Sequence, residues 1–213
     1  IDLNDIKNII GSFEFAKIII IDINFLSTLP VRQMNSGYAE MIKHSLIDSK
    51  EHWNKIIDVD SSKDVNNSLI YNSIMTKIKI IENDPKESSI RKFLNFGHTI
   101  GHAIESFLLS SDREILHGEA ILTGIIIESY LSQKLLNFDT QLNSNIKNYI
   151  LKFSKKIDFS DDDIMHIIEF LKYDKKNRSE EPLFVLLKDV GKPSYDNKVS
   201  NEEIIDAFKF YAV

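Results

Sequence analysis

Two histidines, His98 and His102, lie four residues apart in the segment 91–102. On a helix this spacing places both imidazole rings on one face, one turn apart. Such a pair can share a metal ion, or one ring can bind the metal while the other transfers protons. Histidine pairs on helices are also common in ordinary packing, so the motif alone leaves a structural role open.

Two further segments carry residues of related chemistry. Segment 116–120 places His117 at the expected start of a helix, and segment 35–44 places Glu40 and Lys43 one turn apart. Taken alone, Glu40 and Lys43 would form a solvated ion pair, worth less than ~1 kcal/mol. Two histidines and one glutamate from separate helices would instead supply three nitrogen and oxygen ligands and leave one position open, which is typical of catalytic zinc. The chain has no HExxH motif, so the sequence does not support a zincin protease.

Basic side chains accompany these segments although the whole chain is acidic. It has 26 lysines and arginines against 32 aspartates and glutamates, a formal net charge of −6. This balance argues against broad nucleic-acid binding, which needs a basic excess. The cations in or beside these segments are Lys43, Lys77, Arg91, Lys175 and Lys176. They indicate a small anionic substrate with phosphate or carboxylate groups. For Lys175 and Lys176 the alternative is a solvated helix end, where the helix dipole favours positive charge.

The composition is that of an ordinary globular protein. Of 213 residues, 43% are hydrophobic and 27% are charged. No apolar run approaches the ~20 residues that cross a bilayer, so we expect no membrane partner. The absence of cysteine excludes disulfides and thiolate metal sites and suits a reducing cytoplasm. The sequence contains neither GxGxxG nor GxxxxGK[ST], the glycine-rich motifs that bind phosphate.

The elements that must position these residues are mostly helices. The stretches 17–22, a β-branched run, and 183–187 are the two that predict strands. The expected fold class is therefore mainly α, a helical bundle with a short strand at the N-terminal entrance and another near the C-terminus. Apolar residues at helical spacing and capping signals predict helices over residues 38–47, 69–81, 94–109, 118–136, 143–157 and 161–173 and after Ser200.

The motifs together resemble those of the 3-dehydroquinate synthase family. The resemblance rests on segments 25–30, 36–43, 94–105, 116–120 and 174–177, which follow the family's order along nearly the whole chain. It implies a C-terminal helical domain of the dehydroquinate synthase-like and iron-containing alcohol dehydrogenase-like fold over residues 30–213. Residues 1–29 would be a remnant of the N-terminal NAD-binding α/β domain. Because the chain starts at Ile1, we expect the rest of that domain to be missing and this chain alone to be inactive.

The same resemblance implies a role for individual residues. It places a divalent metal, Zn²⁺ or Co²⁺, on Glu40, His98 and His117, and proton transfer on His102 and Glu87. The NAD contacts it implies are Lys7, Phe25, Leu26, Ser27 and Thr28. The substrate contacts it implies are Asn8, Lys43, Lys77, Arg91, Asn95 and one of Lys175 and Lys176.

The activity that the resemblance implies is that of a phosphorus–oxygen lyase in the shikimate pathway of aromatic amino acid biosynthesis. It converts 3-deoxy-D-arabino-heptulosonate 7-phosphate to 3-dehydroquinate and phosphate with catalytic NAD, in a cytoplasmic homodimer. The alternatives are another sugar-phosphate cyclase, a metal-dependent alcohol dehydrogenase and an inactive metal-binding fragment. The basic set around Arg91, Asn95 and Lys175 favours the synthase, because the substrates of the other cyclases lack its carboxylate.

Overall fold

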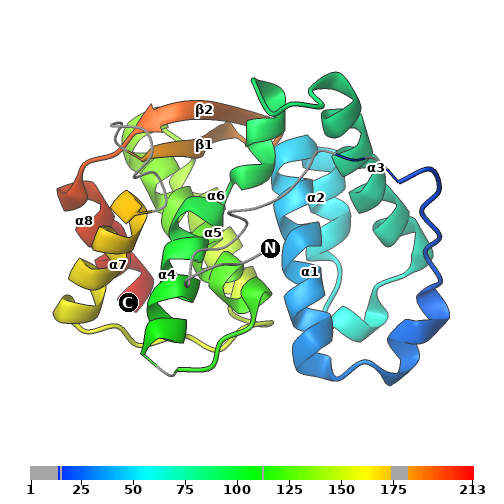
Figure 1. The fold of residues 1–213 in the computed structure, drawn as a ribbon, viewed down its shortest axis with the longest axis horizontal. Helices are drawn as coiled ribbons and strands as arrows, with labels where there is room; N and C mark the ends of the chain where they lie inside the picture. Colours follow the sequence, from blue (N-terminus) through cyan, green and yellow to red (C-terminus); the bar gives the residue numbers. More distant parts are fainter. Residues whose placement is uncertain (1–13, 15, 112, 174–181) are drawn as a thin grey trace.

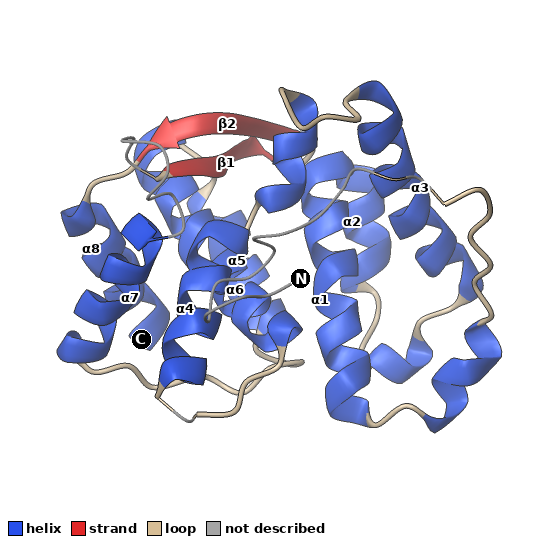
Figure 2. Ribbon diagram, viewed as in Figure 1, coloured by secondary structure: helices blue, strands red, loops and turns tan. Residues whose placement is uncertain are grey.

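The computed structural model describes residues 14, 16–111, 113–173 and 182–213. This part of the chain consists of helices joined by loops, with one β-hairpin (Figures 1 and 2), so the expected mainly α fold class is confirmed. None of its helices combines the length and the apolar character needed to cross a membrane. The elements are η1 (Ile23–Thr28), α1 (Val31–Asp48), α2 (Lys50–Ile57), η2 (Ser62–Asp64), α3 (Asn67–Asn83), η3 (Ile90–Asn95), α4 (His98–Ser110), α5 (His117–Leu136), α6 (Thr140–Ile150), α7 (Asp161–Tyr173), β1 (Leu183–Asp189), β2 (Lys192–Lys198) and α8 (Asn201–Ala212).

Helix α5 lies at the centre of the described structure. Its residues 120–129 are all buried, as expected for a helix that is apolar on every side. It packs against α1, α4, α6, α8 and β1. In Figure 1, α1–α3 gather on one side and α4–α8 on the other, with the β1–β2 hairpin along one end of the bundle. The helices that carry the candidate residues, α1, α4 and α5, therefore meet in the core.

Two predicted helix starts are confirmed as capping boxes. At α7 the Asp163 amide donates to Ser160 Oγ (3.1 Å), and the Ser160 amide donates to Asp163 Oδ2 (3.0 Å). At α8 the Ser200 amide donates to Glu203 Oε2 (2.7 Å), and the Glu203 amide donates to Ser200 Oγ. Each reciprocal pair satisfies backbone N–H groups that a helix start leaves without partners.

The predicted strand over residues 17–22 does not form in the described structure. Its isoleucines at 18–21 are 54–88% exposed, and none of the described residues pairs with them. A strand needs a neighbour for its backbone hydrogen bonds. The β-branched run fits a strand by composition, but neither strand of the described β1–β2 sheet pairs with it.

The strand expected at 183–187 is confirmed as β1, and its partner β2 was not predicted. The two strands pair antiparallel, with Leu183 opposite Lys198 and Leu187 opposite Pro193. Strand β2 is polar and mostly exposed or half-buried, so its sequence lacks the apolar alternation that marks a strand. Short helix α2 was also missed, and the helix expected over residues 143–157 ends at Ile150.

Candidate metal centre

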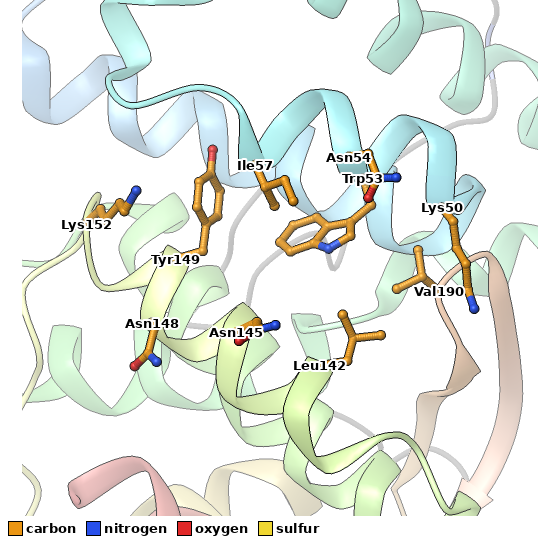
Figure 3. A pocket seen from close by; sticks show the side chains of 10 residues that line it. All are labelled: Lys50, Trp53, Asn54, Ile57, Leu142, Asn145, Asn148, Tyr149, Lys152 and Val190. Atoms are coloured by element: carbon orange, nitrogen blue, oxygen red, sulfur yellow. The ribbon is translucent and has the colours of Figure 1, made fainter.

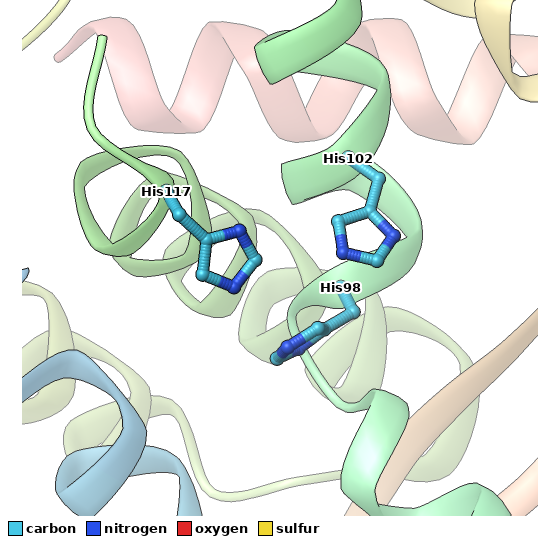
Figure 4. Close-up of side chains that lie close together, drawn as sticks. All are labelled: His98, His102 and His117. Atoms are coloured by element: carbon cyan, nitrogen blue, oxygen red, sulfur yellow. The ribbon is translucent and has the colours of Figure 1, made fainter. Parts of the chain in front are cut away.

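Three imidazole rings converge where α4 and α5 begin. His98 is the first residue of α4, His102 lies one turn further, and His117 is the first residue of α5. The ring centres are 5.1 Å apart for His98 and His102, 5.5 Å for His98 and His117, and 5.6 Å for His102 and His117. One nitrogen from each ring lies within 4.8 Å of the other two, and Figure 4 shows the rings turned toward a common space. These distances allow one metal ion to be shared.

Glu40 of α1 brings a carboxylate to the same place. Its Oε1 lies 3.2 Å from His98 Nε2 and 3.8 Å from His117 Nε2, and its Oε2 accepts a hydrogen bond from the buried Lys43 ammonium (2.6 Å). Oε1 is buried and accepts no hydrogen bond from any described residue. Such an oxygen is costly to bury unless it faces a cation. The two nitrogens and this oxygen therefore fit Zn²⁺ or Co²⁺.

Hydrogen bonds at Nδ1 of His98 and of His117 hold the Nε2 atom of each ring toward Glu40. His98 Nδ1 lies 3.2 Å from the carbonyl oxygen of Phe96, and His117 Nδ1 lies 3.1 Å from Glu105 Oε2. Because a carbonyl and a carboxylate only accept, each Nδ1 carries a proton. In the neutral ring Nε2 then presents its lone pair toward Glu40, as a metal ligand requires.

The surrounding charges set the protonation state of each ligand. Burial lowers the pKa of His98, which keeps the ring neutral. Burial opposes ionisation of Glu40, but the imidazoles of His117 and His98 and the Lys43 ammonium together hold its pKa well below the ordinary value. The Glu105 carboxylate, followed by that of Glu40, raises the pKa of His117 to about 9. Metal binding at neutral pH would thus release a proton from His117.

Close backbone contact brings α1 to α5. A Cβ atom at Gly118 would collide with the carbonyl oxygen of Ser36, and the Gly118 amide donates to Ser36 Oγ (3.0 Å). One turn before Ser36, Arg32 donates to both carboxylate oxygens of Glu119 (2.7 and 2.8 Å). Since Glu40 lies one turn after Ser36, these contacts fix its distance from His117.

A second close contact seats the start of α4 on α5. A Cβ atom at Gly124 would collide with the carbonyl oxygen of Gly97, the residue before His98. The buried carboxylate of Glu128 accepts hydrogen bonds from the Gly97 amide (2.6 Å) and the Ile100 amide (3.0 Å). Glu128 thereby satisfies N–H groups that the start of α4 would otherwise leave without partners.

Stability against pH tests the burial of Glu128. Burial raises its pKa from 4.5 to about 8, against the backbone hydrogen bonds, which lower it. The folded chain then keeps a proton that the unfolded chain loses, so the free energy of unfolding falls as pH rises between 4.5 and 8. The slope contributed is up to ~1.4 kcal/mol per pH unit. In urea titrations across this range we expect Glu128→Gln to remove that slope, and equal slopes in both proteins would contradict the assignment.

A second group of predicted residues lies between α3 and α4, in η3 and the segment before it. The buried carboxylate of Asp84 accepts hydrogen bonds from the backbone amides of Ser88 (3.0 Å), Ser89 (2.7 Å) and Arg91 (3.1 Å). Further along, Asn95 Nδ2 donates to Glu87 Oε1 (2.8 Å). Asp84 thus organises the segment that carries Glu87, Arg91 and Asn95, although sequence reasoning gave it no role.

The other predicted site residues are more dispersed. Lys77 is exposed on α3, and its charge contributes to the lowered pKa of Lys43, for which burial is the main cause. Residues 25–28 lie in η1 and are exposed, Phe25 to 79%. The remaining four predicted contacts lie outside the described residues: Lys7, Asn8, Lys175 and Lys176.

A separate hollow of about 580 Å³ lies between α2 and α6 (Figure 3). Its two lysines have acidic partners, since Lys50 pairs with Asp189 (2.8 Å) and Lys152 with Asp60 (3.3 Å). It contains none of the histidines, so the metal-binding chemistry lies elsewhere. Its lining residues are Lys50, Trp53, Asn54, Ile57, Leu142, Asn145, Asn148, Tyr149, Lys152 and Val190.

Known family models match residues 1–177 of the chain. Residues 37–177 match the 3-dehydroquinate synthase C-terminal model, and residues 1–36 match the 3-dehydroquinate synthase N-terminal model. The 3-dehydroquinate synthase of Parabacteroides distasonis is 42% identical over 99% of this chain and 61% of its own length. That of Pelagibacter ubique is 39% identical over 95% of this chain and 57% of its own length. The chain thus spans about 60% of the length of these relatives.

Solved structures share the fold. A 2-epi-5-epi-valiolone synthase from Streptomyces hygroscopicus with NAD⁺ and Zn²⁺ bound has a TM-score of 0.81 and 19% identity, over 100% of this chain and 60% of that one. A 2-deoxy-scyllo-inosose synthase complexed with carbaglucose-6-phosphate, NAD⁺ and Co²⁺ has a TM-score of 0.80 and 25% identity, over 99% of this chain and 60% of that one. The arrangement of α1, α4 and α5 thus belongs to a fold that these two synthases share.

Proposed function

Since the chain belongs to the 3-dehydroquinate synthase family, we propose that it is the metal- and substrate-binding part of an enzyme of that activity. The whole enzyme would convert 3-deoxy-D-arabino-heptulosonate 7-phosphate to 3-dehydroquinate and phosphate. The observation that carries the proposal is the buried Oε1 of Glu40, which accepts no hydrogen bond from a described residue and faces two imidazole nitrogens. A site of this kind suits an enzyme that must hold an oxygen-rich substrate on a metal.

The proposed ligands are Glu40, His98 and His117, from α1, α4 and α5. His102 satisfies the distances for a ligand as well, but we assign the carboxylate because its orphaned oxygen has no other role. Three ligands leave a coordination position for substrate. When bound there, Zn²⁺ or Co²⁺ would polarise a substrate oxygen as a Lewis acid.

The protein groups around this position bind and orient the substrate. Lys43 holds Glu40 in place by donating to its Oε2 from within the buried site. Arg91, Asn95 and Lys77 would contact the phosphate and carboxylate groups, which fixes the orientation of the reacting carbons. A ring nitrogen of His102, one turn from His98, would take up a substrate proton. Glu87 would also transfer a proton.

NAD and the rest of the protein would contact the N-terminal segment. Residues 25–28 of η1 are exposed, as is the isoleucine run at 18–21, so both surfaces are available to a further domain. We place the boundary between the two parts at residues 29 and 30, because η1 ends at Thr28 and α1 begins at Val31. The homodimer and the cytoplasmic location remain predictions.

A second candidate is another sugar-phosphate cyclase. The observation in its favour is the fold shared with 2-deoxy-scyllo-inosose synthase at 25% identity. The two functions differ in the substrate carboxylate, which the synthase substrate carries and glucose 6-phosphate and sedoheptulose 7-phosphate lack. An inactive metal-binding fragment is the third candidate, because the chain covers only part of its relatives.

Phosphate release tests the proposed function. The chain would be joined to the N-terminal part of the Parabacteroides distasonis relative and assayed with NAD and Zn²⁺. We expect release from 3-deoxy-D-arabino-heptulosonate 7-phosphate by the joined protein and none by this chain alone. Release only from glucose 6-phosphate or sedoheptulose 7-phosphate would support the second candidate. A joined protein that binds NAD and metal but releases no phosphate would support the third.

A further inference from the structure

Glu105 lies on the same face of α4 as the two helical histidines. Positions 98, 102 and 105 follow the spacing i, i+4 and i+7, which is a continuous stripe on a helix. Its Oε2 lies 3.1 Å from His117 Nδ1, so the last member of the stripe contacts the candidate ligand on α5. Helix α4 therefore supplies two rings of the histidine cluster and also the carboxylate that contacts the third ring.

The position of Glu105 is unfavourable for a charge. Its side chain is 6% exposed, and its buried neighbours along α4 include Ala103, Ile104 and Phe107. A carboxylate in such surroundings is costly unless it is paired and hydrogen-bonded. Packing alone would be served by an apolar residue there. The carboxylate instead faces the imidazole of His117, and the side chain of His117 is 42% exposed.

The two sides of the His117 ring have different partners. Nδ1 faces Glu105, while Nε2 lies 3.8 Å from Glu40 Oε1. His98 has the same arrangement, but a neutral carbonyl, that of Phe96, faces its Nδ1. A carboxylate is the stronger acceptor, and it both fixes the ring and strengthens Nε2 as a ligand.

We propose that Glu105 is a positioning residue for His117: it accepts the Nδ1 proton and so holds Nε2 toward the shared metal position. The inference rests on the metal site of the proposed function. It adds a residue that contacts neither metal nor substrate. Groups of this kind change metal affinity by about 10- to 100-fold.

Cobalt titration of the purified chain tests the role. Co²⁺ affinity would be measured for the wild type, Glu105→Ala and Glu105→Gln, with the visible absorption of bound Co²⁺ as a second reading. We expect Glu105→Ala to bind Co²⁺ about 10- to 100-fold more weakly and to change the absorption band. Glu105→Gln keeps an acceptor oxygen and should recover most of the lost affinity. Glu169→Ala, at an exposed glutamate on α7, is the matched control and should bind as the wild type does.

Two outcomes would overturn the inference while leaving the metal site intact. One is wild-type affinity in Glu105→Ala. The other is wild-type affinity in a third variant, Glu105→Leu, which fills similar space without an acceptor oxygen and would therefore indicate a packing role. Failure of the wild type itself to bind Co²⁺ would instead contradict the proposed metal site.

A measurement on the wild type covers the case in which Glu105→Ala does not fold. In the Zn²⁺-loaded chain, a long-range ¹⁵N–¹H spectrum reports which nitrogen of His117 carries the proton. A slowly exchanging proton on Nδ1 supports the proposal, because a hydrogen bond to Glu105 would protect it. A proton on Nε2, with Nδ1 bound to the metal, overturns it.

Discussion

Replacement of His117 by alanine is expected to remove stoichiometric zinc from the purified chain. The His117 ring is a candidate ligand whose Nε2 faces Glu40 and whose Nδ1 is already taken by Glu105. Loss of a direct ligand should weaken zinc binding by more than the ~10- to 100-fold that loss of a supporting group costs. Metal analysis after dialysis against a known zinc concentration would measure it.

The chain offers a matched control for this experiment. His166 is exposed on α7, where its Nδ1 lies 2.9 Å from the backbone carbonyl oxygen of Asp162. His166→Ala should therefore keep one zinc per chain. Glu40→Ala should lose zinc as His117→Ala does. If His117→Ala retained zinc at the wild-type ratio, the assignment of this ligand would be wrong.

Replacement of His102 by alanine is expected to leave zinc in place while turnover falls. The proposed ligands Glu40, His98 and His117 already number three, and a fourth would close the position that the substrate needs. A positioned proton-transfer group contributes ~10²–10⁴-fold to the rate, so kcat of the joined enzyme should fall within that range. KM for the sugar phosphate should change little, because the lost interaction acts mainly in the transition state.

Zinc content and kcat must be measured on the same preparation. The geometry permits His102 as a ligand, since the three imidazoles lie within reach of one ion. A zinc-free His102→Ala would identify His102 as a ligand. A fully active His102→Ala would remove it from the reaction altogether. The predicted role requires a zinc-loaded protein with low turnover.

Sequence periodicity predicted the helices better than it predicted the contacts between them. The apolar pattern predicted a helix over residues 118–136, and the structure confirms it as α5. The sequence did not predict the short helix α2, because it spans Lys50–Ile57, about two turns, and has few apolar positions. The strand predicted over residues 17–22 was wrong, because β-branched composition does not reveal whether a neighbouring strand exists.

The histidine spacing on α4 could be predicted from the sequence, since it depends on helix geometry alone. The approach of Glu40 could not, because it depends on the packing of α1 against α5 at Ser36 and Gly118. No local pattern shows that a glycine meets a distant carbonyl group. Residue chemistry and the resemblance to a family made Glu40 a candidate, and the packing of α1 against α5 gives the physical reason for its position.

The exposed isoleucines at 18–21 also affect how the chain behaves in concentrated solution. Their backbone belongs to no helix and pairs with no described strand, and their side chains are β-branched and apolar. Such a segment offers N–H and C=O groups to another copy and favours intermolecular strand pairing. Self-association through this run is therefore a hazard when the chain is concentrated for crystallisation or spectroscopy. A covering segment that occupied the isoleucines would remove it.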